Sequence, residues 1–170
     1  VGMDTDVYLW IPILSNIVAV LTIPFVGNLS DKIGRRPCIM AGAVGAGALS
    51  FPYLWAVSQQ NVMLAIVLSL IMWGFVYQGY NAVFPAYYPE QFPTKTRVTG
   101  MAISQNMGTV ASSAMAIAFA AIVPPGTAQG TIILTVGAIT FGITLIAAAA
   151  AYFSPETSRI PSDQLGEPGA

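Results

Sequence analysis

Residues 27–36 read Gly-Asn-Leu-Ser-Asp-Lys-Ile-Gly-Arg-Arg and separate two long apolar stretches. The basic residues occur only in this segment, in a second polar segment and near the end of the chain: Lys32, Arg35, Arg36, Lys95, Arg97 and Arg159. If each apolar stretch crosses a membrane once, all of these residues fall on the same side. Short basic loops remain in the cytoplasm, so this pattern predicts an outside N-terminus and a cytoplasmic C-terminus.

Five apolar stretches carry the fold prediction, at about 7–29, 37–57, 61–87, 99–123 and 131–153. The chain has a mean hydropathy of +0.70 and only 8% charged residues, whereas soluble domains have about 25%. About 20 helical residues cross a hydrocarbon core about 30 Å thick, and barrel strands are much shorter. We therefore expect an all-α membrane protein with five transmembrane helices over 1–157. The polar residues 158–170 are expected to be a disordered cytoplasmic tail.

Composition also excludes several functions. The chain has no histidine and a single cysteine, Cys38, so it offers no His-based metal site and no internal disulfide. No acidic or basic residue falls in the middle of an apolar stretch, and no basic stripe fits nucleic acid. These features argue against an enzyme, a metal or organic cofactor and a membrane-embedded signalling centre. The chain does not begin with Met, and we expect it to be part of a longer protein.

Three motifs resemble those of the major facilitator superfamily. The first is the Gly-x-Leu-Ser-Asp-x-x-Gly-Arg-Arg spacing of residues 27–36, which in that superfamily joins two transmembrane helices. Residues 90–100 resemble the Glu-x-Phe-Pro-Thr-x-x-Arg-x-x-Gly segment of its metabolite:proton symporter branch, and residues 154–157 resemble a Pro-Glu-Thr ending. Their order implies helices eight to twelve of a twelve-helix carrier. The fold would then be a six-helix C-terminal half that lacks its first helix.

The resemblance implies a secondary active transporter with alternating access in an inner membrane. Its substrate would be a small polar metabolite of the organic acid, amino acid or betaine type, moved by proton symport. An uncoupled facilitator, a drug/proton antiporter or a non-transporting fragment remain alternatives. The implied partners are the lipid bilayer, the substrate, protons and a missing N-terminal half. A proton-carrying residue is expected in that absent half.

Polar side chains within the apolar stretches are the candidate substrate contacts, because such groups are rare on a lipid-facing surface. Gly74, Tyr77, Gln78 and Asn81 follow the spacing of one helical face. The other candidates lie in the first and fourth stretches: Asn16, Gln105, Asn106 and Thr109. The alternative interpretation is that these groups only bond neighbouring helices.

The polar loops are the candidate cytoplasmic gate. The gate residues predicted from the resemblance are Gly27, Asp31, Gly34, Arg35, Arg36, Glu90, Arg97 and Glu156. Gly27 is expected to allow close helix approach, and Gly34 to adopt a backbone conformation that other residues resist. The resemblance implies that Asp31 meets a helix of the other half. It also implies ion pairs among the arginines and glutamates that close the cytoplasmic side.

Overall fold

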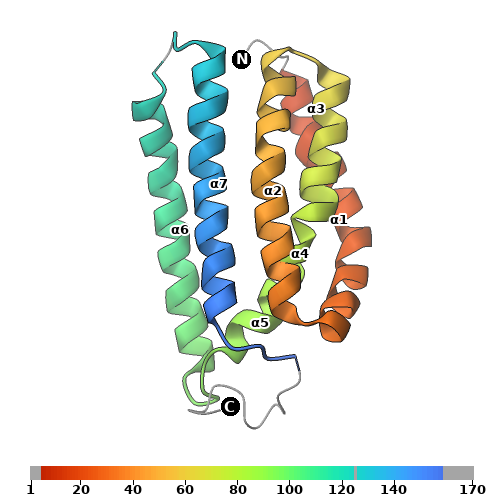
Figure 1. The fold of residues 1–170 in the computed structure, drawn as a ribbon, viewed down its shortest axis with the longest axis vertical. Helices are drawn as coiled ribbons and strands as arrows, with labels where there is room; N and C mark the ends of the chain where they lie inside the picture. Colours follow the sequence, from red (N-terminus) through yellow and green to blue (C-terminus); the bar gives the residue numbers. More distant parts are fainter. Residues whose placement is uncertain (1–4, 125, 159–170) are drawn as a thin grey trace.

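The chain forms five helical rods that run alternately up and down in a computed structural model describing residues 5–124 and 126–158 (Figure 1). The elements are α1 (Thr5–Ile33), α2 (Arg35–Ser58), a broken third rod made of α3 (Val62–Ser69), η1 (Leu70–Val76), α4 (Gln78–Asn81) and α5 (Phe84–Glu90), then α6 (Arg97–Ile122) and α7 (Gln129–Phe153). The described range contains no strand. The prediction of an all-helical chain with five rods is confirmed.

Four rods are long and apolar enough to cross a membrane by length and composition: Leu9–Ile33, Arg35–Ser58, Val62–Glu90 and Gln129–Phe153. Helix α6 has 26 residues and is therefore long enough, but it is less apolar than these four rods. Its serine, threonine, glutamine and asparagine side chains are the reason. The prediction of five similarly apolar spans therefore overstated the apolarity of this helix.

The described basic segments lie at one end of the bundle. The α1–α2 turn, the α5–α6 loop and the end of α7 are all at the bottom of Figure 1, opposite the α2–α3 and α6–α7 connections. We call this the basic end. The described basic loops thus share one end of the bundle, and their side of a membrane stays a prediction. Arg159 and the predicted tail from 159 onward lie outside the described residues.

The turn between α1 and α2 is shorter than the interval of residues 30–36 that separates the first two predicted apolar stretches. Helix α1 continues to Ile33 and α2 begins at Arg35, so Gly34 alone reverses the chain. Its φ of 108° lies in the region that favours glycine, and its N–H donates to the Ser30 carbonyl at 3.0 Å. The conformational role expected for Gly34 is confirmed.

Helix α2 lies at the centre and packs most extensively against α7. A side chain at Gly47 would collide with Thr144, and its Cβ would lie 2.9 Å from the Phe141 ring. Across the same interface, a Cβ at Gly137 would lie 2.7 Å from the Phe51 ring. Small residues allow such close contact between helices in lipid. We call this interface the α2–α7 seam.

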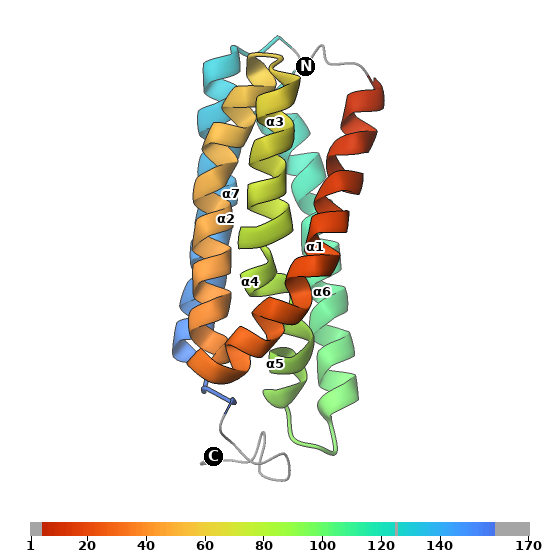
Figure 2. The same ribbon diagram turned by 90° about the vertical axis from the view of Figure 1, so that its right-hand side faces the viewer.

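The third rod is not a continuous helix. Asn61 starts it by accepting the Leu64 N–H at 3.0 Å, and a π-helical segment, η1, then precedes α4. Pro85 lies in the first turn of α5, where a missing N–H costs little, and α5 continues to Glu90. These breaks leave the rod bent beside α1 and α2, as Figure 2 shows.

Candidate functional site

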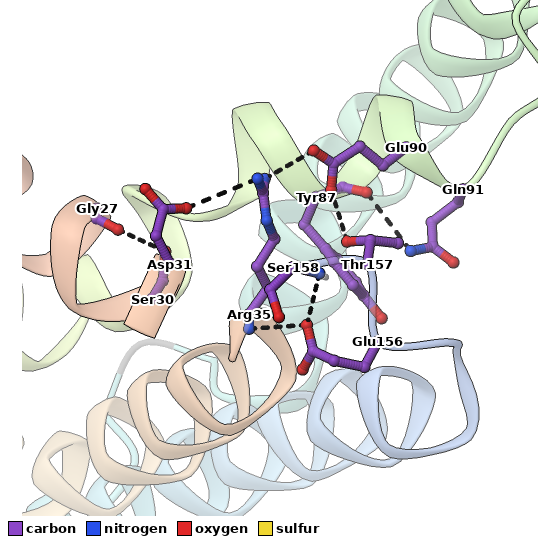
Figure 3. Close-up of polar contacts among 10 residues, drawn as sticks. All are labelled: Gly27, Ser30, Asp31, Arg35, Tyr87, Glu90, Gln91, Glu156, Thr157 and Ser158. Atoms are coloured by element: carbon purple, nitrogen blue, oxygen red, sulfur yellow. Dashed lines mark hydrogen bonds and ion pairs between the residues drawn. The ribbon is translucent and has the colours of Figure 1, made fainter. Parts of the chain in front are cut away.

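Residues from three parts of the chain meet at the basic end (Figure 3). The adjoining ends of α1 and α2 contribute Asp31 and Arg35, α5 contributes Glu90, and the segment after α7 contributes Glu156 and Thr157. We call these residues the basic-end cluster. All of them except Thr157 were predicted gate residues, so the structure brings together side chains that are up to 126 positions apart (31 to 157).

Glu156 caps the N-terminus of α2. Its two carboxylate oxygens accept the N–H groups of Arg35 and Arg36, each at 3.0 Å, and Oε1 also accepts the Ser158 N–H at 3.2 Å. Partial burial raises the pKa of Glu156, but these hydrogen bonds outweigh burial and lower its pKa. A Cβ at Gly34 would lie 2.8 Å from Oε2, so glycine there also makes room for the cap.

Arg36 provides the reciprocal cap at the C-terminus of α7. Its Nε donates to the Ala151 carbonyl at 3.0 Å, its Nη2 donates to the Tyr152 carbonyl, and the guanidinium lies 5.5 Å from the Tyr152 ring centre. A cation is favoured at a helix C-terminus, and an anion at an N-terminus. The two charges therefore join antiparallel helices at their polar ends, where Glu156 and Arg36 both bind backbone groups.

Arg35 joins the α2 end to α5. Its Nη1 lies 3.0 Å from Glu90 Oε1, and both side chains are mostly buried, at 15% and 16% exposed. Glu90 Oε2 also accepts the Thr157 hydroxyl at 2.5 Å, and the Tyr87 hydroxyl donates to the Pro155 carbonyl at 3.1 Å. The segment after α7 is thereby fixed to α5 by two hydrogen bonds.

Three further predicted gate residues are Asp31, Arg97 and Gly27. Asp31 is 66% exposed and lies 3.7 Å from Arg35 Nη2, and Arg97 donates to the Phe92 carbonyl at 3.3 Å within its own loop. Gly27 has open space where a Cβ would stand, so no helix of the described residues approaches it closely, and close helix approach there stays a prediction. Its carbonyl instead accepts the Ser30 hydroxyl at 2.7 Å.

A cavity of about 390 Å³ lies between α1, α2 and the third rod; we call it the α1-side cavity. The predicted substrate residues Asn16, Tyr77, Gln78 and Asn81 all line it. Gly74 is buried instead against Val18 of α1, where its Cβ would lie 2.8 Å from Cγ1. The structure thus places three of the four residues of the predicted helical face around one cavity, together with Asn16 of the first stretch.

The amides of this cavity are partly engaged with the protein. Gln78 is buried and donates to the Trp73 carbonyl at 2.7 Å, beside the π-helical segment. Asn81 donates to Gln78 Oε1 at 3.1 Å, and Asn16 donates to the Pro12 carbonyl at 2.8 Å. Each Asn amide has two N–H donors, so one hydrogen bond to the protein leaves a second donor for a ligand.

A second cavity of about 510 Å³, the α6-side cavity, lies between the third rod and α6. Gln105 and Thr109, both predicted substrate contacts, line it together with the aromatic residues Tyr80 and Phe84. Asn106 is exposed and donates to the Ala102 carbonyl at 2.7 Å, and it lines neither cavity. The polar candidates of α6 are therefore separated from those of α1 and α4.

A row of aromatic rings along the third rod was missed at the sequence level. Successive ring centres lie 4.6–6.3 Å apart along Trp73, Tyr77, Tyr80, Phe84, Tyr88 and Phe92. The rings are three or four residues apart, which is the spacing of helix neighbours and was the available signal. Trp73 and Tyr77 line the α1-side cavity, while Tyr80 lines the α6-side cavity.

Comparison with known proteins identifies the family. The model of the Major Facilitator Superfamily matches residues 1–169. The ectoine/proline transporter of Corynebacterium glutamicum is 34% identical over 97 residues, covering 57% of this chain and 19% of that protein. The "Probable 4-methylmuconolactone transporter" of Cupriavidus pinatubonensis is 27% identical and aligns with 100% of this chain and 43% of that protein. The citrate-proton symporter of Klebsiella pneumoniae is 31% identical over 51% of this chain and 20% of its own length.

The chain belongs to the Major Facilitator Superfamily, a class of multi-pass membrane transporters. It spans less than half the length of each of these relatives. No solved structure matches it.

Proposed function

We propose that this chain is the C-terminal part, helices eight to twelve, of a secondary active transporter for a small polar metabolite. The observation that carries the proposal is the α1-side cavity, in which Asn16, Tyr77, Gln78 and Asn81 converge inside apolar rods. Polar groups at this depth are expensive unless they serve a partner helix or a transported solute. Alternating access then consists of rocking this half against the missing half around the cavity.

The proposed coupling is proton symport. The relatives named for citrate-proton symport and for ectoine and proline transport support a small organic acid, amino acid or betaine as cargo. No acidic or basic residue of the described range lines either cavity. A proton-carrying group therefore belongs to the absent half under this proposal.

Uptake by cells that express the complete reading frame tests this function. We expect accumulation of a labelled cargo against its gradient, and abolition of that accumulation by an uncoupler. Equilibration that an uncoupler leaves unchanged would indicate a facilitator, and uncoupler-sensitive efflux would indicate an antiporter. Absence of transport for organic acids, amino acids and betaines alike would contradict the proposal.

The proposed orientation places the basic end in the cytoplasm of an inner membrane, with the N-terminus outside. Gln60 lies in the α2–α3 connection and Lys95 in the α5–α6 loop, and both are exposed. Single cysteines at these positions, in a Cys38→Ala background, will report separately on which side of the membrane each loop lies. A membrane-impermeant maleimide should label Gln60→Cys on intact cells and Lys95→Cys only after permeabilisation; the reverse pattern would contradict this orientation.

The basic-end cluster is proposed as the gate. Asp31 is exposed, so its carboxylate is accessible to a helix N-terminus in the other half. We expect Asp31→Asn to reduce transport severalfold with unchanged membrane insertion. Normal uptake by that variant would remove Asp31 from the gate.

A further inference from the structure

We propose that the α1-side cavity holds the cationic nitrogen of a zwitterionic substrate against aromatic ring faces, without a carboxylate partner from this chain. The inference rests on the proposed function and specifies its substrate class. The substrate is an amino acid derivative or betaine whose positive and negative charges are both permanent near neutral pH. The inference predicts that a simple anion of the same size binds this site more weakly.

Aromatic side chains from α2 and the third rod line the cavity. Tyr53 comes from α2, Trp73 from η1, and Tyr77 lies between η1 and α4. The Trp73 and Tyr77 ring centres lie 5.0 Å apart with planes inclined by 59°, so the rings form a corner and not a stack. A cation near such faces is attracted by the ring quadrupoles, most strongly to Trp and when water is excluded.

The amide groups of the same cavity fit the opposite end of a zwitterion. Asn16 on α1 and Asn81 on α4 are both exposed, and each uses one amide N–H in an observed bond. The second N–H of each amide is chemically suited to donate to a carboxylate. Amides supply hydrogen bonds without adding charge, so they match a substrate whose net charge is zero.

The charge balance of the cavity favours a zwitterion over either kind of ion. No acidic or basic residue among the described residues lines it. An isolated anion or cation loses hydration there without a counter-charge from these residues, which is costly in a membrane interior. A zwitterion carries its own counter-charge, and the aromatic corner and the amides then stabilise its two ends separately.

The first test compares two solutes of the same shape on the unaltered protein, expressed from its complete reading frame. Glycine betaine and 3,3-dimethylbutanoate differ in that a carbon atom replaces the cationic nitrogen. We expect labelled glycine betaine to be taken up, and at least tenfold weaker competition by 3,3-dimethylbutanoate. Equal competition by the two solutes would overturn the inference.

The second test removes a ring face while a matched variant keeps it. Tyr77→Leu should raise the KM for glycine betaine about tenfold, whereas Tyr77→Phe should change it less than threefold, because the face and not the hydroxyl binds the cation. Phe75→Leu, which removes an exposed ring of η1 that lines neither cavity, should leave the KM unchanged. Equal effects of the two Tyr77 variants would overturn the inference.

The two proposals fail in distinguishable ways. Uptake of citrate or another organic acid, with no uptake of glycine betaine, would overturn the zwitterion site and leave the transporter function intact. No uptake of any of these solutes would overturn both.

Discussion

The α2–α7 seam and helix α6 are both rich in small residues, yet they use them in opposite ways. In the seam, glycines bring side chains of the facing helix close to the backbone, as Gly47 does with Phe141 and Gly137 with Phe51. In α6, no residue is buried, and a Cβ at Gly108 would meet nothing within 4 Å. Small residues therefore allow close helix packing in the α2–α7 seam, whereas in α6 they form a surface that faces solvent or a partner.

The polar groups of the two regions also differ in whether they bond within one helix or between helices. Hydroxyls of α6 donate to the carbonyl four residues back, as Ser104, Thr109 and Ser113 do at 2.8–3.0 Å. These bonds satisfy the donors within the helix and leave oxygen lone pairs for water or a solute. At the polar end of the seam, Glu156 and Arg36 bond across helices instead. We infer that the seam is scaffold and that α6 borders the transport pathway.

The largest effect is expected from filling a glycine at a backbone crossing. In Gly42→Leu, the new Cβ would lie 2.7 Å from the Gly79 carbonyl carbon and would also collide with the Tyr80 nitrogen. Backbone atoms cannot move aside cheaply, so we expect more than about 3 kcal/mol of destabilisation and little folded protein. Fluorescence-detected size exclusion in detergent will measure the folded yield.

Gly108→Leu is the matched control on α6. Because its Cβ meets open space, we expect the folded yield of this variant to stay near that of the unaltered chain. A similar loss of yield in both variants would mean that α6 packs as tightly as α2, and the comparison would fail.

The next largest effect is expected at the Arg35–Glu90 pair. In Arg35→Met, the mostly buried Glu90 carboxylate loses its cationic partner, which should cost about 2 kcal/mol. A lower midpoint of thermal unfolding in detergent will report this loss. In Arg35→Met/Glu90→Gln, the unpaired charge is also removed, and part of the stability should return. If the double variant is no more stable than the single one, the pair does not act as described.

Loss of the α2 cap should have a smaller, pH-dependent effect. Glu156→Gln keeps one acceptor oxygen but places an NH₂ group against backbone N–H donors, and helix caps contribute about 1 kcal/mol. Because the pKa of Glu156 is lowered in the folded state from its ordinary value of 4.5, its stabilisation is present above about pH 4.5 and is lost as the pH falls through the folded pKa. Thermal unfolding from pH 7 to pH 3.5 should therefore show the unaltered chain converging on the variant. A gap that is independent of pH would contradict the cap.

The smallest effect on stability is expected on α6. Thr109 is exposed and its hydroxyl bonds only its own helix among the contacts described, so Thr109→Val should change stability by less than about 0.5 kcal/mol. Transport should nevertheless fall, because Thr109 lines the α6-side cavity. Thermal unfolding and uptake of the same variant will separate the two effects, and unchanged uptake would weaken the assignment of α6 to the pathway.

Much of the fold could be predicted because the signals are local. The lengths of the apolar stretches predicted five helical rods. The positions of the basic residues predicted that the basic loops lie together, and Gly34 indicated the turn between α1 and α2. The π-helical segment could not be predicted, since no residue type requires it. Its presence shifts the helical phase between Trp73 and Tyr77.

The candidate site was partly predictable because some of its residues have a local signal, which is a polar side chain within an apolar stretch. Side-chain polarity marked Asn16, Tyr77, Gln78 and Asn81, but polarity cannot reveal Trp73 or Tyr53, which resemble the lipid-facing aromatics around them. The sequence also could not distinguish one cavity from two, because that depends on the separation of α6 from α1. The contact of Thr157 with Glu90 joins residues 67 positions apart and is set only by tertiary packing.

Water accessibility of α6 relative to α7 tests the central claim most directly. Thr109 and Ile146 are both exposed in this chain, but the account places the first beside an aqueous pathway and the second, which is 71% exposed, against lipid. In a Cys38→Ala background of the complete protein, Thr109→Cys should react with a membrane-impermeant thiol reagent and be protected by substrate, while Ile146→Cys should not react. An unreactive Thr109→Cys beside a reactive Ile146→Cys would contradict the account.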